Sequence, residues 1–129
     1  MISLLVTAHA LEERIEKTLA VHGLSFAKLN VLTLMVDAGR PLQLSEVAAR
    51  LNCVRSNVTQ LVDRLEADGL VRREPDPTDR RSIRAVLSAE GKKRQALGSA
   101  EYQRILGEFT RSLPESDRHA LGRVLALLK

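Results

Sequence analysis

Apolar residues recur every three or four positions in several separate stretches of the chain, a spacing that places them on one face of an α-helix. The first stretch stops at His22-Gly23, and its apolar positions are Leu4, Ala8, Leu11, Ile15 and Leu19. Ser25 is a suitable N-cap for a second helix that ends at Gly39 and Pro41 and carries Leu29, Leu32, Met35 and Val36. The pattern therefore predicts two helices before residue 40.

The same spacing predicts two helices near the end of the chain. Ser88 and the acidic Glu90 mark the start of the first, whose apolar stripe is Leu97, Tyr102, Ile105, Leu106 and Phe109. Ser112-Leu113-Pro114-Glu115 has the spacing of a capping box and opens the second. The apolar face of that last helix consists of Leu121, Val124, Leu125 and Leu128.

In the middle of the chain, two shorter helices are separated by a tight turn. Ser45 is a good N-cap for a helix over Glu46 to Leu51, and Asn52-Cys53-Val54 forms the turn. The second helix runs from about Arg55 to Ala67, and its inward positions are Val58, Leu61, Val62 and Leu65. This arrangement predicts a helix-turn-helix.

The side of this second helix that points away from its apolar stripe is rich in hydrogen-bonding groups. At 100° per residue, Ser56, Gln60 and Asp63 lie opposite the stripe, with Asn57, Thr59 and Arg64 on its flanks. Such groups can pair with base edges in the major groove of DNA, although any surface helix also turns polar residues outward. Asp63 could accept from a cytosine amine or pair with Arg64 or Arg55, and we favour the pairing role.

A basic hairpin is predicted directly after this helix, which Asp68-Gly69 brings to an end. Leu70 to Glu74 and Ser82 to Leu87 have the pattern of short strands around Pro75-Asp76-Pro77-Thr78-Asp79-Arg80-Arg81. Arg80 and Arg81 lie at the tip, where a guanidinium could enter the minor groove, and one arginine is expected to pair with Asp79. A solvated charged hairpin is the alternative, but the position after a recognition helix favours contact with DNA.

Composition limits the class of protein, and the distribution of charge supports a DNA-binding role for the predicted helix-turn-helix and hairpin. A chain of 129 residues with 44% hydrophobic content suits one domain with a core. It lacks an apolar run of the roughly 20 residues that span a membrane, and its start does not resemble a signal peptide, so we expect a cytoplasmic protein. Residues 50–94 hold eleven basic and seven acidic residues, a surplus that equals the net charge of +4. The excess positive charge thus coincides with the predicted motif.

The sequence provides no recognisable catalytic or metal site. There is one cysteine, Cys53, which excludes an internal disulfide; it could be a redox switch, but a buried thiol is favoured. His9, His22 and His119 are too scattered for a metal site. Neither a Ser/His/Asp set nor a glycine-rich phosphate loop is present, so we expect no enzyme activity, no metal and no cofactor.

Five blocks of sequence resemble the MarR family of bacterial transcription regulators, and the similarity extends from about His22 to Lys93. They are Leu44-Ser45-Glu46-Val47-Ala48, Ser56-Asn57-Val58-Thr59, Leu65-Glu66-Ala67-Asp68-Gly69-Leu70-Val71, Asp79-Arg80-Arg81 and Leu87-Ser88-Ala89-Glu90-Gly91. The resemblance implies a homodimer that binds a pseudo-palindromic operator, often as a repressor released by a phenolic or other aromatic effector. It also implies DNA contacts at Arg55, Ser56, Asn57, Thr59, Gln60, Arg64, Arg80, Arg81 and Arg84. It places His9, His22 and Phe26 beside the ligand cleft.

The expected fold is mainly α with a small β-hairpin wing. We expect one domain over 1–129, in which 25–88 form the winged helix-turn-helix and 1–22 and 89–129 form dimerisation helices. The apolar stripes of those terminal helices exceed what a lobe of about 65 residues needs, which itself favours a dimer. Val54 stands where the family commonly has a capping serine, so the recognition helix lacks that cap unless it begins at Ser56. A winged-helix module that binds protein rather than DNA is the alternative function.

Overall fold

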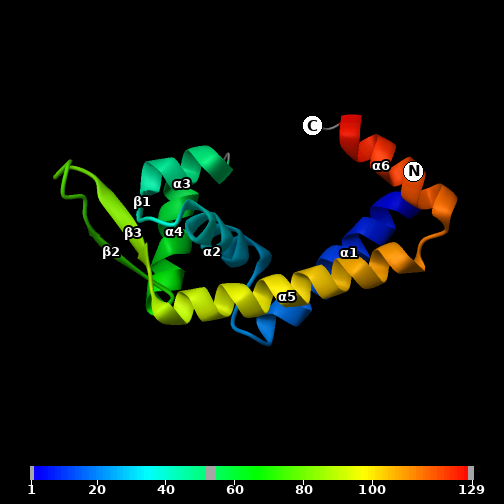
Figure 1. Cartoon of the computed structure of the whole chain (residues 1–129), viewed down its shortest axis with the longest axis horizontal. Coiled ribbons are helices and arrows are strands. Elements are labelled where there is room, and N and C mark those ends of the chain that lie inside the picture. Colours follow the sequence, from blue (N-terminus) through cyan, green and yellow to red (C-terminus); the bar gives the residue numbers. More distant parts are fainter. Residues whose placement is uncertain (1, 52–54, 128–129) are drawn as a thin grey trace.

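The computed structural model describes the backbone of residues 2–51 and 55–127, and it contains the helices and the hairpin that the sequence predicts (Figure 1). Side chains are described for residues 5–51, 56–120, 122 and 123. In chain order the elements are α1 (Ile2–Ala20), α2 (Phe26–Ala38), β1 (Leu42–Gln43), α3 (Leu44–Leu51), α4 (Arg55–Ala67), β2 (Val71–Pro75), β3 (Ile83–Leu87), α5 (Ala89–Ser112) and α6 (Glu115–Leu127). The expected fold class, mainly helical with a small hairpin, is confirmed.

Short polar residues begin two of the helices as predicted. The Ser25 hydroxyl accepts a hydrogen bond from the backbone N–H of Lys28 at 3.1 Å, and the Ser88 hydroxyl accepts one from that of Gly91 at 2.9 Å. Gly39 ends α2, where its N–H donates to the carbonyl of Met35. These caps satisfy backbone groups that have no partner inside the helix.

Two other predicted caps are wrong. α3 begins at Leu44, so Ser45 lies inside its first turn, and the Glu46 carboxylate accepts from the backbone N–H of Gln43 at 3.3 Å. Ser112 belongs to the last turn of α5, where its hydroxyl donates to the carbonyl of Phe109. α3 thus begins one residue before the expected cap, whereas α5 continues through the cap expected for α6, which begins at Glu115.

The hairpin belongs to a three-stranded antiparallel sheet with the order β1-β3-β2. β2 and β3 pair so that Glu74 lies opposite Arg84, and β1 joins the other edge of β3 with Leu42 opposite Ala85. β1 was not predicted, because two residues are too few to show the alternation of a strand. Through β1, the start of α3 lies beside the end of β3 that is nearest the turn of the hairpin.

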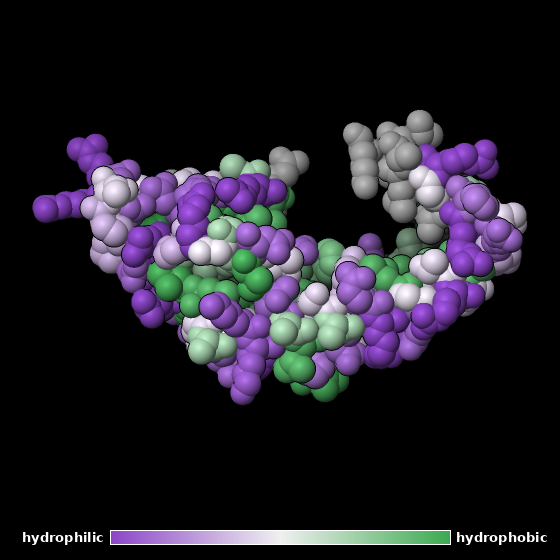
Figure 2. Space-filling model, viewed as in Figure 1, coloured by the Kyte–Doolittle hydropathy of each residue, from purple (hydrophilic) through white to green (hydrophobic). Residues whose placement is uncertain are grey.

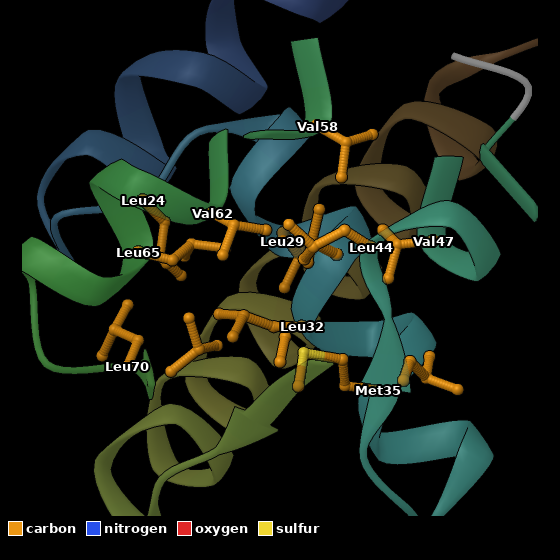
Figure 3. Close-up of a cluster of buried hydrophobic side chains, with 14 of the residues drawn as sticks. Leu24, Leu29, Leu32, Met35, Leu44, Val47, Val58, Val62, Leu65 and Leu70 are labelled. Carbon is orange, nitrogen blue, oxygen red and sulfur yellow. The ribbon is translucent and has the colours of Figure 1, made fainter. Parts of the chain in front are cut away.

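One hydrophobic core lies between the helices and the sheet. Figure 3 shows side chains of α2, α3 and α4 meeting at its centre, and the fully buried ones include Leu32, Val47, Val62 and Leu65. Burial of each such side chain contributes about 1.5–3 kcal/mol relative to leaving it in water. We call residues 24–88, which provide most of this core, the lobe.

The remaining helices extend away from the lobe. α5 runs from the base of the hairpin to the opposite end of the molecule, with α1 beside it and α6 at the far end (Figure 1). We call residues 2–14 of α1, residues 99–112 of α5 and α6 the arm. In the predicted stripe of α1, Ile15 and Leu19 are buried in the core and Ala8 is exposed. Within the described ranges, none of the helices has the length and apolar character needed to cross a membrane.

Candidate nucleic-acid interface

α4 presents the predicted polar face to solvent. Ser56, Asn57, Gln60 and Arg64 are exposed and Thr59 is half-buried, while the opposite face packs into the core. Arg55 is the first residue of α4 in the structure, but its side chain lies outside the described residues. Cys53 and Val54, and with them the questions of a redox thiol and of a missing cap, also lie outside the described residues. The described polar face offers donors and acceptors suited to base edges.

Asp63 on this helix forms an ion pair, and among the described side chains its partner is not the predicted Arg64. Its partner is Arg73 of β2, whose guanidinium also donates to Glu66 at 3.1 Å. The backbone N–H of Arg73 donates to Glu66 at 2.7 Å, and this bond is the largest cause of the lowered pKa of Glu66. The pairing with Arg64 was wrong because β2 brings a guanidinium from outside the helix to Asp63. α4 is thus fastened to the hairpin, and both acids next to its polar face have a basic partner.

The turn of the hairpin, residues 76–82, which we call the wing tip, carries two exposed arginines. Arg80 and Arg81 have no ionic partner among the described residues, and Figure 2 shows hydrophilic side chains projecting from this end of the molecule. Asp79 accepts from the backbone N–H of Arg81 at 3.1 Å and from the hydroxyl of Ser82 at 2.9 Å. The predicted pairing of Asp79 with an arginine side chain is therefore wrong, because the turn itself provides closer donors.

Arg84 differs from the two arginines of the wing tip. It lies opposite Glu74 on the hairpin, and its Nε donates to the Glu74 carboxylate at 2.7 Å. This bond is the main cause of the lowered pKa of Glu74, which Arg72 also approaches to 3.5 Å. Arg84 is therefore held at the base of the wing by an acid, whereas Arg80 and Arg81 are available to a ligand.

A buried carboxylate at the base of the wing tip was not predicted as a functional residue. Asp76 is the one charged residue classed as buried in the described part of the chain. It accepts hydrogen bonds from the side chain of Gln43 at 2.6 Å and from the N–H and hydroxyl of Thr78 at 2.9 and 2.8 Å. These bonds, first that from Gln43, lower its pKa to about 2. The sequence shows only an aspartate in a turn, since the partner lies 33 positions away.

The structure does not gather the three residues expected near a ligand cleft into one site. His9 is exposed on α1 and pairs with Glu13, about 16 Å along the helix axis from the end of α1. The carbonyl of His22 accepts from Arg94 at 2.8 Å, and the ring of Phe26 lies 5.6 Å from that of Tyr102. Across the described ranges, no group of three or more histidine, cysteine or acidic residues is arranged to hold a metal ion.

The wing tip and the helix-turn-helix share one side of the lobe. In Figure 1 the wing tip and α3 lie on the side that faces away from α5, and α4 runs from this side toward α5. The exposed arginines and the first turns of α4 can thus face a common partner. The model of the MarR family matches residues 22–82, the range that contains these elements.

The chain thus resembles the MarR family over its helix-turn-helix and wing. It is 40% identical over 70 residues to the transcriptional regulator YkoM of Bacillus subtilis, an alignment that covers 54% of this chain and 45% of YkoM. It is 39% identical over 80 residues to the transcriptional repressor YetL of the same organism, which covers 61% of this chain and 48% of YetL. The matched part thus spans about half the length of these curated relatives.

Solved structures of MarR-family proteins share the fold across nearly the whole chain. Sco3205 from Streptomyces coelicolor, solved in complex with DNA, is 25% identical and superimposes with a TM-score of 0.83 over 98% of this chain and 81% of its own. CouR from Rhodococcus jostii, solved with p-coumaroyl-CoA, is 26% identical with a TM-score of 0.75 over 95% of this chain and 85% of its own. The arm as well as the lobe therefore has counterparts in this family.

Proposed function

We propose that this protein is a sequence-specific, double-stranded DNA-binding regulator of transcription. The observation that carries the proposal is the pair of exposed arginines on the wing tip, which have no ionic partner among the described residues. They lie on the same side of the lobe as the first turns of α4. α4 then enters the major groove, and Arg80 and Arg81 reach the adjacent minor groove, whose negative potential attracts guanidinium groups. The likeness to Sco3205, which was solved with DNA, supports the proposal that this chain binds DNA.

The DNA-binding unit that we propose is a homodimer held by the terminal helices. Leu5 and Val6 at the start of the arm are 66% and 63% exposed, which is a cost for apolar side chains that no partner covers. A second arm packed around a twofold axis covers them and presents two copies of α4. Copies separated by one turn of DNA, roughly 34–36 Å, recognise an inverted repeat.

The residues of α4 that we expect to select the operator are Arg55, Ser56, Asn57, Thr59, Gln60 and Arg64. Contacts to base edges confer specificity, whereas the guanidinium groups of the wing add affinity that depends less on sequence. Arg84, which pairs with Glu74, also contributes to the positive electrostatic potential of the wing. The residues of α4 and of the wing thus have separable effects on specificity and affinity.

Repression released by a small aromatic molecule is the regulation that we propose. YetL is named a repressor, and CouR was solved with p-coumaroyl-CoA, which contains a phenol. In this chain the Phe26 and Tyr102 rings mark the junction of α2 with α5, near His22, where an aromatic effector can stack. His9 lies too far along α1 to share that position within one subunit.

The deciding experiment selects genomic DNA that the purified protein binds and measures its affinity by fluorescence anisotropy. The variant Arg80→Ala/Arg81→Ala is expected to weaken binding roughly 100-fold and to flatten the dependence of affinity on salt, because phosphate and minor-groove contacts are lost. Lys92→Ala/Lys93→Ala is the matched control, since it removes the same charge from exposed positions on α5. Absence of binding by the native protein at low salt contradicts the proposal, as does equal weakening by both variants.

A further inference from the structure

The contact between Gln43 and Asp76 joins two parts of the proposed DNA-binding surface that are distant in sequence. Gln43 ends β1 and directly precedes α3, while Asp76 begins the wing tip. Their side chains meet at 2.6 Å, where the Gln43 amide donates to the Asp76 carboxylate. Because the carboxylate is charged and buried, this bond is stronger than one between neutral groups.

Each partner in this contact is fixed within its own element. The backbone N–H of Gln43 donates to the carboxylate of Glu46 in the first turn of α3, and Arg40 donates to the same carboxylate at 2.9 Å. The other oxygen of Asp76 accepts from the N–H and hydroxyl of Thr78, and the backbone N–H of Asp76 donates to the carbonyl of Ser82 at 3.0 Å. The bond thus connects two ordered segments.

The backbone pairing of β1 with β3 places the strands of the hairpin beside α3, and the wing tip beyond them has contacts of its own. Asp79 holds the tip internally, through the N–H of Arg81 and the hydroxyl of Ser82. Arg73, in the middle of β2, fastens the hairpin to α4 through Asp63 and Glu66. Of the polar contacts given for the described residues, the one from Gln43 is the side-chain hydrogen bond that links the wing tip to the start of α3.

We propose that Gln43 and Asp76 are positioning residues that set the wing tip at the angle at which Arg80 and Arg81 reach DNA together with α4. This inference rests on the proposed function. Neither residue needs to touch DNA. Their bond restricts the orientations of the wing tip in the free protein. Less conformational entropy is then lost when the protein binds DNA, and this preorganisation strengthens the affinity for DNA.

An exchange of charge between the two positions tests the inference. In Gln43→Glu two carboxylates face each other, and we expect affinity for DNA to fall roughly tenfold because the wing tip is pushed away from α3. Adding Asp76→Asn restores a donor opposite a carboxylate with the polarity reversed and the total charge of the pair unchanged. The double variant is therefore expected to regain most of the affinity. Gln103→Glu, at an exposed position of α5, controls for the added charge.

A double-mutant cycle that combines changes at Gln43 and at the wing arginines shows whether Gln43 acts by positioning these arginines or by maintaining the structure in general. In the Arg80→Ala/Arg81→Ala background, Gln43→Glu should weaken binding less than twofold further, because no arginines remain to be positioned. Gln43→Met removes the donor without adding charge and keeps the comparison available if the glutamate variant does not fold. Additive losses of affinity overturn the inference, and so does failure of Asp76→Asn to rescue Gln43→Glu.

Hydrogen exchange tests the inference without DNA. In Gln43→Met, the Thr78 and Ser82 amides should exchange at least several-fold faster than in the native protein, while amides in the core of α2 stay unchanged. Unchanged exchange in the wing tip overturns the inference even if the native protein binds DNA. Faster exchange in a protein that binds no DNA supports the contact between wing and α3, contradicts the proposed function, and overturns the part of the inference that concerns DNA.

Discussion

In the lobe, apolar side chains from α2, from α4 and from the start of the hairpin segment pack together, and Leu32, Leu65 and Leu70 are fully buried. In the arm, by contrast, Leu5 and Val6 are largely exposed. The two regions also differ in how their helices are held. The lobe holds most of the core residues, whereas the arm combines the buried Ile105 with a group of ion pairs. The lobe is thus complete within one chain, and the arm has apolar surface that is free to bind a second copy.

Ion pairs along the arm illustrate the difference. Arg14 of α1 pairs with Glu108 of α5, and Arg104 donates to Glu101 at 2.7 Å and to Glu108 at 3.1 Å. The bond from Arg14 is the largest cause of the lowered pKa of Glu108. Such pairs near the surface orient helices but add little stability, because water and salt screen them. The pair of Arg14 with Glu108 can fix the direction of α1 along α5 while leaving an apolar surface for association.

Two glycines of α5 provide the largest contrast between the regions. A Cβ at Gly91, where α5 meets the lobe, would lie 2.1 Å from the backbone oxygen of Leu70, while one at Gly107 in the arm would approach Arg111 no closer than 3.5 Å. Gly91→Ala should therefore lower the free energy of unfolding by about 1–3 kcal/mol, since backbone must move.

Gly107→Ala serves as the control and should raise the free energy of unfolding by about 0.4–1 kcal/mol, because alanine restricts the unfolded chain and suits a helix. Urea denaturation of both variants at one protein concentration measures the two effects. Equal changes in the two variants would show that α5 packs against the lobe less tightly than the Gly91 contact indicates.

Charge placed on the exposed start of the arm tests association. Leu5→Glu is expected to raise the dissociation constant of the dimer at least tenfold, because a carboxylate would be buried in the apolar interface. Light scattering over a range of concentrations measures the mass of the particle. The thermal unfolding of the lobe at high dilution should be unchanged, since Leu5 is absent from its core. A monomeric native protein would refute the assignment of the arm to dimerisation.

The sequence predicted those features of the site that depend on near neighbours. The polar face of α4 follows from helical periodicity, and the exposed position of Arg80 and Arg81 follows from a turn rich in proline and aspartate. The caps at Ser25 and Ser88 were also predicted, because each donor lies three positions beyond its acceptor.

Contacts between distant positions could not be predicted in the same way. Asp63 meets Arg73 only because β2 returns along α4, and Asp76 meets Gln43 only because the two residues of β1 pair with β3. Periodicity reports which face of an element is apolar, but it does not give the register in which two elements meet. The predicted pairing of Asp63 with Arg64 was wrong for this reason.

The smallest expected effect comes from two serines that the sequence predicts to be helix caps. Ser25 caps α2 in the lobe, whereas Ser112 in the arm does not cap α6. Ser25→Ala removes the acceptor for the Lys28 N–H and should lower the free energy of unfolding by about 1 kcal/mol. Ser112→Ala removes only a hydroxyl that donates to the Phe109 carbonyl within α5, a position where alanine is the better helix former. Its effect should therefore lie within about 0.5 kcal/mol of zero, as for most surface changes. Both variants can be compared by urea denaturation at one concentration. A loss at Ser112 as large as that at Ser25 would mean that this hydroxyl does cap α6, and that α6 begins with the capping box that its sequence suggests.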